Sequence, residues 1–79
     1  MIFVTLLTIR PEQNKEAYSA IKKFKLPKGV SLKTMYGLFG RYDAVLIYEA
    51  KDEKTGMNFL LDICKIPGVT DTETMVATW

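Results

Sequence analysis

The chain has 79 residues, of which 48% are hydrophobic and 25% charged, and a net charge of +2. This length supports one domain, and the composition is that of a globular protein rather than a disordered one. So small a charge argues against binding to nucleic acid or to an anionic membrane. The single cysteine, Cys64, excludes an internal disulfide. Because no secretory leader or membrane-length apolar run is apparent, we expect a cytoplasmic protein.

The first predicted strand runs from Ile2 to Ile9 and is apolar on both alternating faces, as in a strand that is covered on two sides. One face carries Phe3, Leu7 and Ile9, and the other carries Ile2, Val4 and Leu6. Pro11 is tolerated in a first helical turn, which predicts a helix from there to Phe24. The apolar face of that helix consists of Ala17, Ala20, Ile21 and Phe24.

The second strand is predicted from Val30 to Leu38 by an alternating pattern. Its two faces are expected to carry Val30, Leu32, Thr34, Tyr36 and Leu38 on one side and Ser31, Lys33, Met35 and Gly37 on the other. A tight turn around Gly40 follows, because glycine accepts a positive φ, and the third strand runs from about Asp43 to Ala50. Asp43 suits the start of a strand because its short side chain can bond its own backbone.

Asp52 is the expected N-cap of a second helix that ends near Cys64. Its apolar positions predict a broad buried stripe: Met57, Phe59, Leu60, Leu61, Ile63 and Cys64. Gly56 is unfavourable inside a helix, and a close approach to another backbone would explain a glycine there. The last strand is predicted from Val69 to Ala77, and Trp79 is either a packing anchor or a frayed end.

This order of elements, β-α-β-β-α-β, predicts an α+β, ferredoxin-like fold with the first and third strands in the centre of the sheet. Two helices cover only one face of such a sheet, and the central strands are apolar on both faces. The second face therefore needs a cover, and the simplest one is a second copy of the chain. Val4, Leu6, Val45 and Ile47 are candidates for that contact, but the sequence leaves open which alternate set faces the partner.

Two segments carry a resemblance to a known family. They are Phe39-Gly40-Arg41-Tyr42-Asp43 before an apolar strand, and Pro67-Gly68-Val69 before Thr70, Thr72 and Thr74. Over essentially residues 1–79 the chain resembles the effector-binding RAM domain of Lrp/AsnC regulators. The resemblance implies a dimeric α/β barrel, assembly into octamer-like rings, and an amino-acid ligand held between dimers. It implies a homo-oligomer that uses no cofactor. It also implies that this oligomer joins full-length Lrp/AsnC regulators and takes part in transcription regulation.

The family's regulators carry a DNA-binding helix-turn-helix ahead of this domain, whereas here a strand begins at Ile2. We therefore expect a single stand-alone module, residues 1–79, that does not itself bind DNA. The run from Tyr36 to Asp43, with Glu49 to Asp52, is also similar to the small GYD-domain proteins, which have the same architecture and no settled activity. The Pro67-Gly68-Val69 ending favours the first resemblance.

The candidate ligand site is the turn together with the last strand. Its members are Gly40, Arg41, Tyr42, Asp43, Thr70, Thr72 and Thr74. The Arg41 guanidinium suits a carboxylate and the Asp43 carboxylate suits an ammonium, which is the pairing that an amino acid needs. The alternative for each residue is structural, because Gly and Asp form turns and Thr forms strands.

An enzyme is the weaker hypothesis, and we expect no metal, because the chain contains no histidine. Cys64 is expected to be a small core residue rather than a nucleophile. A small α/β-barrel enzyme, or a GYD-type protein acting on another small molecule, is the alternative. The sequence does not identify the ligand.

Overall fold

The computed structural model describes residues 1–78, so Trp79 lies outside the described residues. The order of elements is confirmed, with one short 3-10 helix ahead of the first α-helix. The elements are β1 (Ile2–Ile9), η1 (Pro11–Gln13), α1 (Asn14–Lys22), β2 (Val30–Gly37), β3 (Ala44–Ala50), α2 (Glu53–Cys64) and β4 (Val69–Val76). The first helical segment thus ends two residues before Phe24, and β2 and β4 each end one residue earlier than expected.

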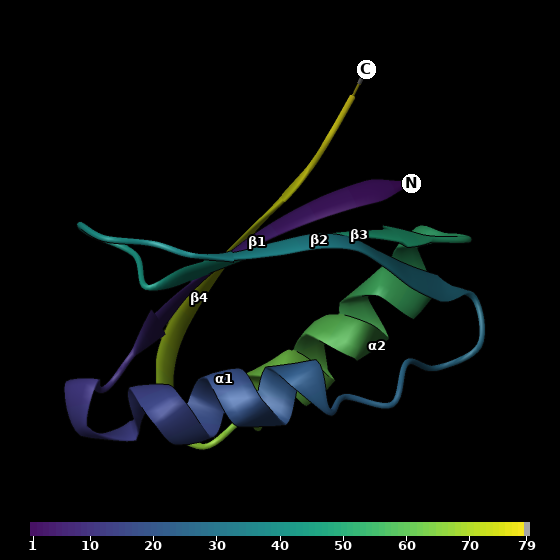
Figure 1. Ribbon diagram of the computed structural model, residues 1–79. Coiled ribbons are helices and arrows are strands. Elements are labelled where there is room, and N and C mark those ends of the chain that lie inside the picture. The colour runs from purple at the N-terminus through teal and green to yellow at the C-terminus, as the bar shows by residue number, and fades with distance from the viewer. Residues whose placement is uncertain (79) are drawn as a thin grey trace.

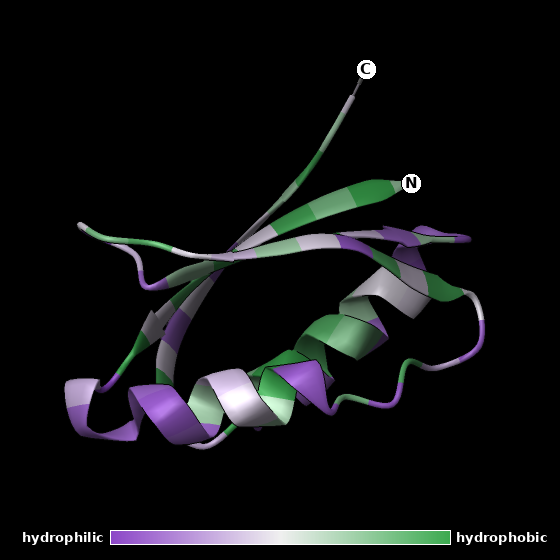
Figure 2. Ribbon diagram, in the orientation of Figure 1, coloured by the Kyte–Doolittle hydropathy of each residue, from purple (hydrophilic) through white to green (hydrophobic). Residues whose placement is uncertain are grey.

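The four strands form one antiparallel sheet in the order β2-β3-β1-β4, so β1 and β3 are central, as predicted. Both helices lie on the same side of the sheet, and the other side carries no element of the described chain (Figure 1). Figure 2 shows that the outward side of α1 is mostly hydrophilic, whereas β1 is mostly hydrophobic along its length. We call the two sides of the sheet the covered face and the open face.

The core lies between the covered face and the helices. Phe3 stacks on Tyr48 with ring centroids 5.3 Å apart, and Tyr48 meets Phe59 of α2 edge-on at 4.9 Å. Gly56 is placed where its helix crosses Phe3, since a Cβ built on Gly56 would lie 2.2 Å from that ring. The close approach predicted for this glycine is present, but the group that approaches is the Phe3 side chain rather than another backbone. Asp52 is also confirmed as the N-cap, because its carboxylate accepts from the Thr55 N–H at 2.8 Å.

The apolar stripe of α2 is narrower than the sequence predicted. Phe59 and Ile63 are buried, but Met57 and Leu61 are exposed, and so is the thiol-bearing Cys64. The prediction that Cys64 is a core residue is therefore wrong. Only one side of α2 packs against the sheet, so the residues on that side, Gly56, Phe59 and Ile63, are buried and the other apolar positions are not.

The alternation predicted along β2 is also wrong in its second half. The pairing of β2 with β3 shifts between Leu32 and Thr34, so that Lys33 is an extra residue in the strand. Leu32 is paired with Tyr48 and Met35 with Leu46, which places both on the covered face. Thr34 and Tyr36 pair instead with Ile47 and Val45, on the open face.

The open face is now defined by residue pairs. Val4 is opposite Ile47 and Leu6 is opposite Val45, and all four are only partly buried. On β4, Met75 lies beside Val4 and is 45% exposed. Of the two alternate sets, this one is uncovered within one chain, and Phe3, Leu7, Leu46 and Tyr48 form the core.

Candidate ligand site at the hairpin turn

The β2–β3 turn projects beyond the sheet (Figure 1). Gly40 has a φ of 114°, a conformation that side chains with a Cβ rarely adopt, and a Cβ there would meet no neighbour within 4 Å. The Leu38 N–H donates to the Asp43 carbonyl at 2.9 Å and closes the turn. Phe39, at the tip, is fully exposed. The turn is therefore rigid at its base and open at its tip.

Asp43 fastens the base of the turn to β1. Its carboxylate oxygen Oδ2 accepts from the Ile9 N–H at 2.7 Å, and its own N–H donates to the Leu7 carbonyl at 2.8 Å. The Tyr18 hydroxyl of α1 donates to the Asp43 carbonyl. The expected bond to its own backbone is wrong, because the carboxylate reaches a neighbouring strand instead. The Oδ2 atom of Asp43 is thus already hydrogen-bonded within the chain.

Tyr42 connects the turn to the far strand across the open face. Its hydroxyl donates to Oε1 of Glu73, which pairs with Leu6 in the register of β1 and β4. That hydrogen bond is the main cause that raises the pKa of Tyr42 above its ordinary value. The Arg41 guanidinium carbon lies 5.6 Å from the centre of the Tyr42 ring, within cation–π range. Tyr42 therefore contacts one cation through its ring and one carboxylate through its hydroxyl.

The three candidate threonines do not act together. Thr70 donates to the Thr8 carbonyl at 3.3 Å, at the bulge where β4 begins to pair with β1. Thr72 and Thr74 pair with Leu7 and Thr5, so they point to the covered face. The Thr72 hydroxyl lies 3.7 Å from the Cys64 thiol, and the Thr74 hydroxyl lies 2.9 Å from the Thr5 hydroxyl.

The candidate residues thus divide between the two faces of the sheet. The structure brings Arg41 and Tyr42 together on the open face and places Asp43 and Thr70 at the end of β1. It adds Glu73, which the sequence analysis did not select. The signal was present, because alternation along β4 puts Glu73 on the face opposite Thr72 and Thr74, beside the apolar Leu6.

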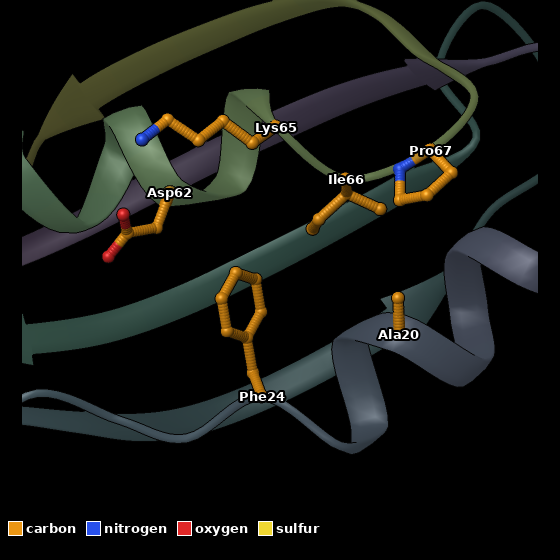
Figure 3. Close-up of a pocket in the computed structure, with 6 residues that line it drawn as sticks. All are labelled: Ala20, Phe24, Asp62, Lys65, Ile66 and Pro67. Carbon is orange, nitrogen blue, oxygen red and sulfur yellow. The ribbon is translucent and has the colours of Figure 1, made fainter.

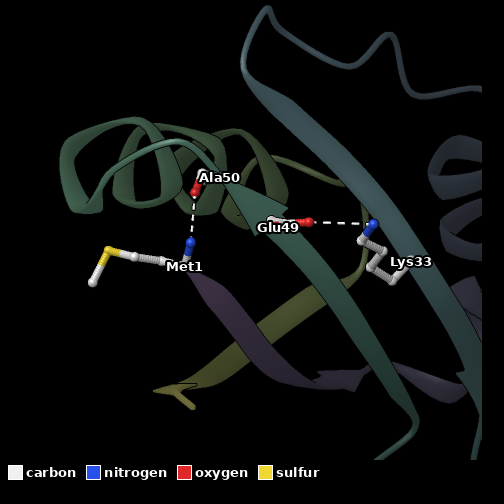
Figure 4. Close-up of polar contacts among 4 residues, drawn as sticks. All are labelled: Met1, Lys33, Glu49 and Ala50. Carbon is white, nitrogen blue, oxygen red and sulfur yellow. Dashed lines mark hydrogen bonds and ion pairs between the residues drawn. The ribbon is translucent and has the colours of Figure 1, made fainter. Parts of the chain in front are cut away.

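The opposite end of the sheet is held by two simple polar contacts (Figure 4). The Met1 nitrogen donates to the Ala50 carbonyl at 2.9 Å, and Lys33 pairs with Glu49 at 3.2 Å. Both side chains of that ion pair are about half exposed, so it contributes little to stability. It lies at the β2 bulge and helps to keep Lys33 turned toward solvent.

A hollow of about 300 Å³ lies between the two helices, on their outer side (Figure 3). Phe24 and Ala20 form one wall, and Ile66 and Pro67 form the other. Asp62 and Lys65 lie at the α2 side of this hollow, so it too combines an apolar surface with both signs of charge. It is the main competitor of the turn as a place for a zwitterion.

Within residues 1–78 there is no group of three or more Asp, Glu, Cys or His side chains placed to hold a metal ion. No helix in the same part of the chain is both long and apolar enough to cross a membrane.

The fold is shared with several solved structures. TTHA0845 from Thermus thermophilus superposes with a TM-score of 0.81 at 23% identity, covering 99% of this chain and 92% of that one. FFRP-DM1 gives 0.79 at 22% identity, with 96% of each chain covered. The transcriptional regulator NMB0573 from Neisseria meningitidis, solved with L-Met, gives 0.76 at 18% identity, covering 98% of this chain and 49% of the regulator.

These likenesses establish the ferredoxin-like fold, and the last of them is to one half of a larger protein. No curated protein matches the sequence. A family match is found across residues 5–79, and it is to the relative that the sequence analysis placed second, on the turn that runs from Tyr36 to Asp43. The chain belongs to the GYD domain family.

Proposed function

We propose that this chain is an effector module that binds a small molecule, an amino acid, between two of its dimers and modulates transcription regulators. The observation that carries the proposal is an uncovered apolar sheet face that ends in a pair of opposite charges, Arg41 and Glu73, held beside Tyr42. The fold that the chain shares with NMB0573, a regulator solved with L-Met, supports it.

Dimerisation follows from the open face. Val4, Leu6, Val45 and Ile47 form a contiguous apolar surface on the two central strands, where contact with solvent is most costly. A second copy placed face to face covers them by two-fold symmetry, since the same patch is self-complementary. The turn then lies at the rim of the dimer, where an octamer-like ring brings it against a neighbouring dimer.

The ligand's two charges have partners at this rim. The guanidinium of Arg41 takes the carboxylate, and the carboxylate of Glu73 takes the ammonium, whereas Asp43 stays bonded to the Ile9 N–H at the end of β1. The Tyr42 hydroxyl, now bonded to Glu73, supplies a further polar contact. Gly40 leaves the backbone of the turn accessible, and Thr70 stands at the far side of β1. Thr72 and Thr74 point away from this cluster.

Nothing in this arrangement requires a cofactor, a metal or a membrane, and we propose binding without chemistry. Regulation is proposed to act through contact with full-length Lrp/AsnC regulators of the same fold rather than through DNA. With a net charge of +2 the chain neutralises few phosphates, so specific binding to DNA by the purified protein is not expected.

A thermal-shift screen with individual amino acids tests the proposal. We expect at least one to raise the melting temperature, and Arg41→Gln to weaken its binding at least about tenfold, because a hydrogen bond to a charged group contributes roughly 1.5–3 kcal/mol. Lys65→Gln, in the hollow between the helices, is the matched control and should leave binding unchanged. Recovery of the ligand unaltered separates a binding module from the alternative, an enzyme.

Two results would contradict the proposal in different ways. If Lys65→Gln abolishes the stabilisation and Arg41→Gln does not, the ligand sits between the helices rather than at the turn. If no amino acid stabilises the protein, the amino-acid assignment is wrong.

A further inference from the structure

A second hollow, of about 340 Å³, opens on the covered side of the edge strand β2. Its floor is formed by Leu32 and Met35 of β2 and by Leu46 of β3. Two of these, Leu32 and Met35, face the helices only because the extra residue Lys33 lies between them. The bulge therefore builds the floor: regular alternation would turn Met35 to the other side of the sheet.

We call this hollow the β2 slot. Its walls are formed by α1, by α2 and by the segment that connects α1 to β2. Ile21 of α1 and Phe59 of α2 are buried and form its inner end. Phe24 and Leu26, in the segment that connects α1 to β2, form its outer wall. Phe24 packs on Phe59 with ring centroids 5.6 Å apart, which fixes the position of that wall.

The slot is left unfilled by the fold itself. The connecting segment after Lys22 swings outward before it returns as β2 (Figure 1). Leu26 is 38% exposed and Leu32 and Met35 are only partly buried. Its volume is within the range of ligand pockets, roughly 300–1,000 Å³, which are mostly apolar with few polar groups.

The charge at the rim selects the ligand's head group. Lys22 carries the only formal charge among the residues that line the slot, and it is exposed at the end of α1. An anion gains from Lys22, whereas an ammonium would face the same sign of charge. This separates the slot from the turn, where Tyr42 contacts both a cation, Arg41, and a carboxylate, Glu73.

We propose that the β2 slot binds a small carboxylic acid that has an aromatic or branched apolar body and no amino group. The body lies on Leu32 and Met35 beneath Phe24, and the carboxylate faces Lys22. The site is complete within one chain, and it stays accessible when the open face is covered, because it lies on the opposite side of the sheet. It does not depend on the function proposed for the turn.

Titration of the isotopically labelled full chain with 3-phenylpropionate, followed by amide NMR, tests the proposal. We expect the signals of Phe24, Leu32 and Met35 to move, and those of Tyr42 and Glu73 to stay. The neutral analogue 3-phenylpropan-1-ol should bind two- to fivefold more weakly, the effect of about one exposed ion pair. Phenylalanine, which adds an ammonium near Lys22, should also bind the slot two- to fivefold more weakly than 3-phenylpropionate.

Three variants make the assignment specific. Leu26→Trp fills the slot from an exposed loop position and should weaken 3-phenylpropionate binding at least tenfold. Lys22→Gln should weaken it two- to fivefold, and Lys23→Gln, the next residue and not part of the lining, should not change it. Leu32→Ala, which removes part of the floor, is a second test should the tryptophan variant fail to fold.

The proposal is overturned if neither compound moves the slot signals at millimolar concentration. It is also overturned if the moving signals are those of Val4 and Ile47, which would mean adventitious binding to the open face. Full affinity in a folded Leu26→Trp protein, or in Leu32→Ala, would overturn it as well. None of these outcomes bears on amino-acid binding at the turn, which is read from Tyr42 and Glu73.

Discussion

The two faces of the sheet are built from the same two central strands but are in very different environments. Phe3 and Leu7 of β1 are fully buried, while Val4 and Leu6, between them in the sequence, are partly exposed. Both sets are apolar, so hydrophobicity alone does not decide which one the helices cover. What distinguishes them is packing: Phe3 stacks on Tyr48 and fits against Gly56, which lacks a side chain at the contact.

This difference assigns a separate role to each face. The covered face accounts for the fold of one chain, because the buried core lies between it and the helices. The open face has apolar side chains in register across β1 and β3 without a cover in one chain, and we propose that it is the assembly surface. Substitutions should therefore affect stability on one face and association on the other.

The largest effect on folding is expected from Phe3→Ala. Phe3 is fully buried in a cluster of three aromatic rings, and truncating such a side chain costs about 3–5 kcal/mol of unfolding free energy. Urea unfolding should show this loss at every protein concentration. A cost below about 1 kcal/mol would mean that Phe3 is not part of the core.

Ile47→Lys should break the open face instead. A lysine at the centre of a dimer contact leaves a charge without a partner, so we expect dimer affinity to fall at least about a hundredfold while the chain stays folded. Analytical ultracentrifugation with circular dichroism measures both. Lys15→Glu, on the exposed surface of α1, is the control. An unchanged dimer would exclude this face as the interface.

Asp43→Ala should have an intermediate effect on folding. It removes the acceptor of the Ile9 N–H at 2.7 Å and leaves that partly buried donor unpaired, a loss of about 1–3 kcal/mol. Asp43→Asn keeps an amide oxygen that can accept the same bond and should lose less. Hydrogen exchange at the Ile9 amide reports the contact directly. Equal stability of the alanine variant and the wild type would show that the tether contributes nothing.

The smallest expected effect on stability comes from Asp52, the N-cap of α2, and it appears only at acidic pH. The hydrogen bond from Thr55 lowers the pKa of Asp52 below its ordinary value of 3.8. Because the folded-state pKa is the lower one, the contribution of Asp52 to stability is present above 3.8 and is lost as the pH falls through the folded-state value. Asp52→Asn should flatten this acid limb slightly, and an identical pH profile would contradict the cap's role.

Much of the architecture could be predicted from the sequence because its signals are local. Pro11, Gly40 and the Asp52 cap mark ends of elements, and the apolar character of β1 and β3 placed them in the centre. The bulge at Lys33 could not be predicted, because alternation of residue types continues through it while the pairing with β3 shifts. For the same reason, the position of Met35 on the covered face could not be predicted.

The candidate site was less predictable, since it depends on contacts between distant strands. Arg41 and Tyr42 were selected from the turn, but their neighbour Glu73 follows about thirty positions later and is identified only by the register of β4 on β1. Asp43 was read as a ligand for an ammonium or as a local turn former. Its bond to Ile9 is a third role, which requires knowing that the turn lies beside the end of β1.

The measurement that most directly tests the assignment of the open face is sedimentation equilibrium of the unmodified chain at micromolar concentration. The account predicts a dimer or a larger assembly built from dimers, with Ile47→Lys shifting it to a folded monomer. A wild-type chain that is a stable, folded monomer throughout this range would contradict the account, because the apolar face formed by Val4, Leu6, Val45 and Ile47 would then remain in water.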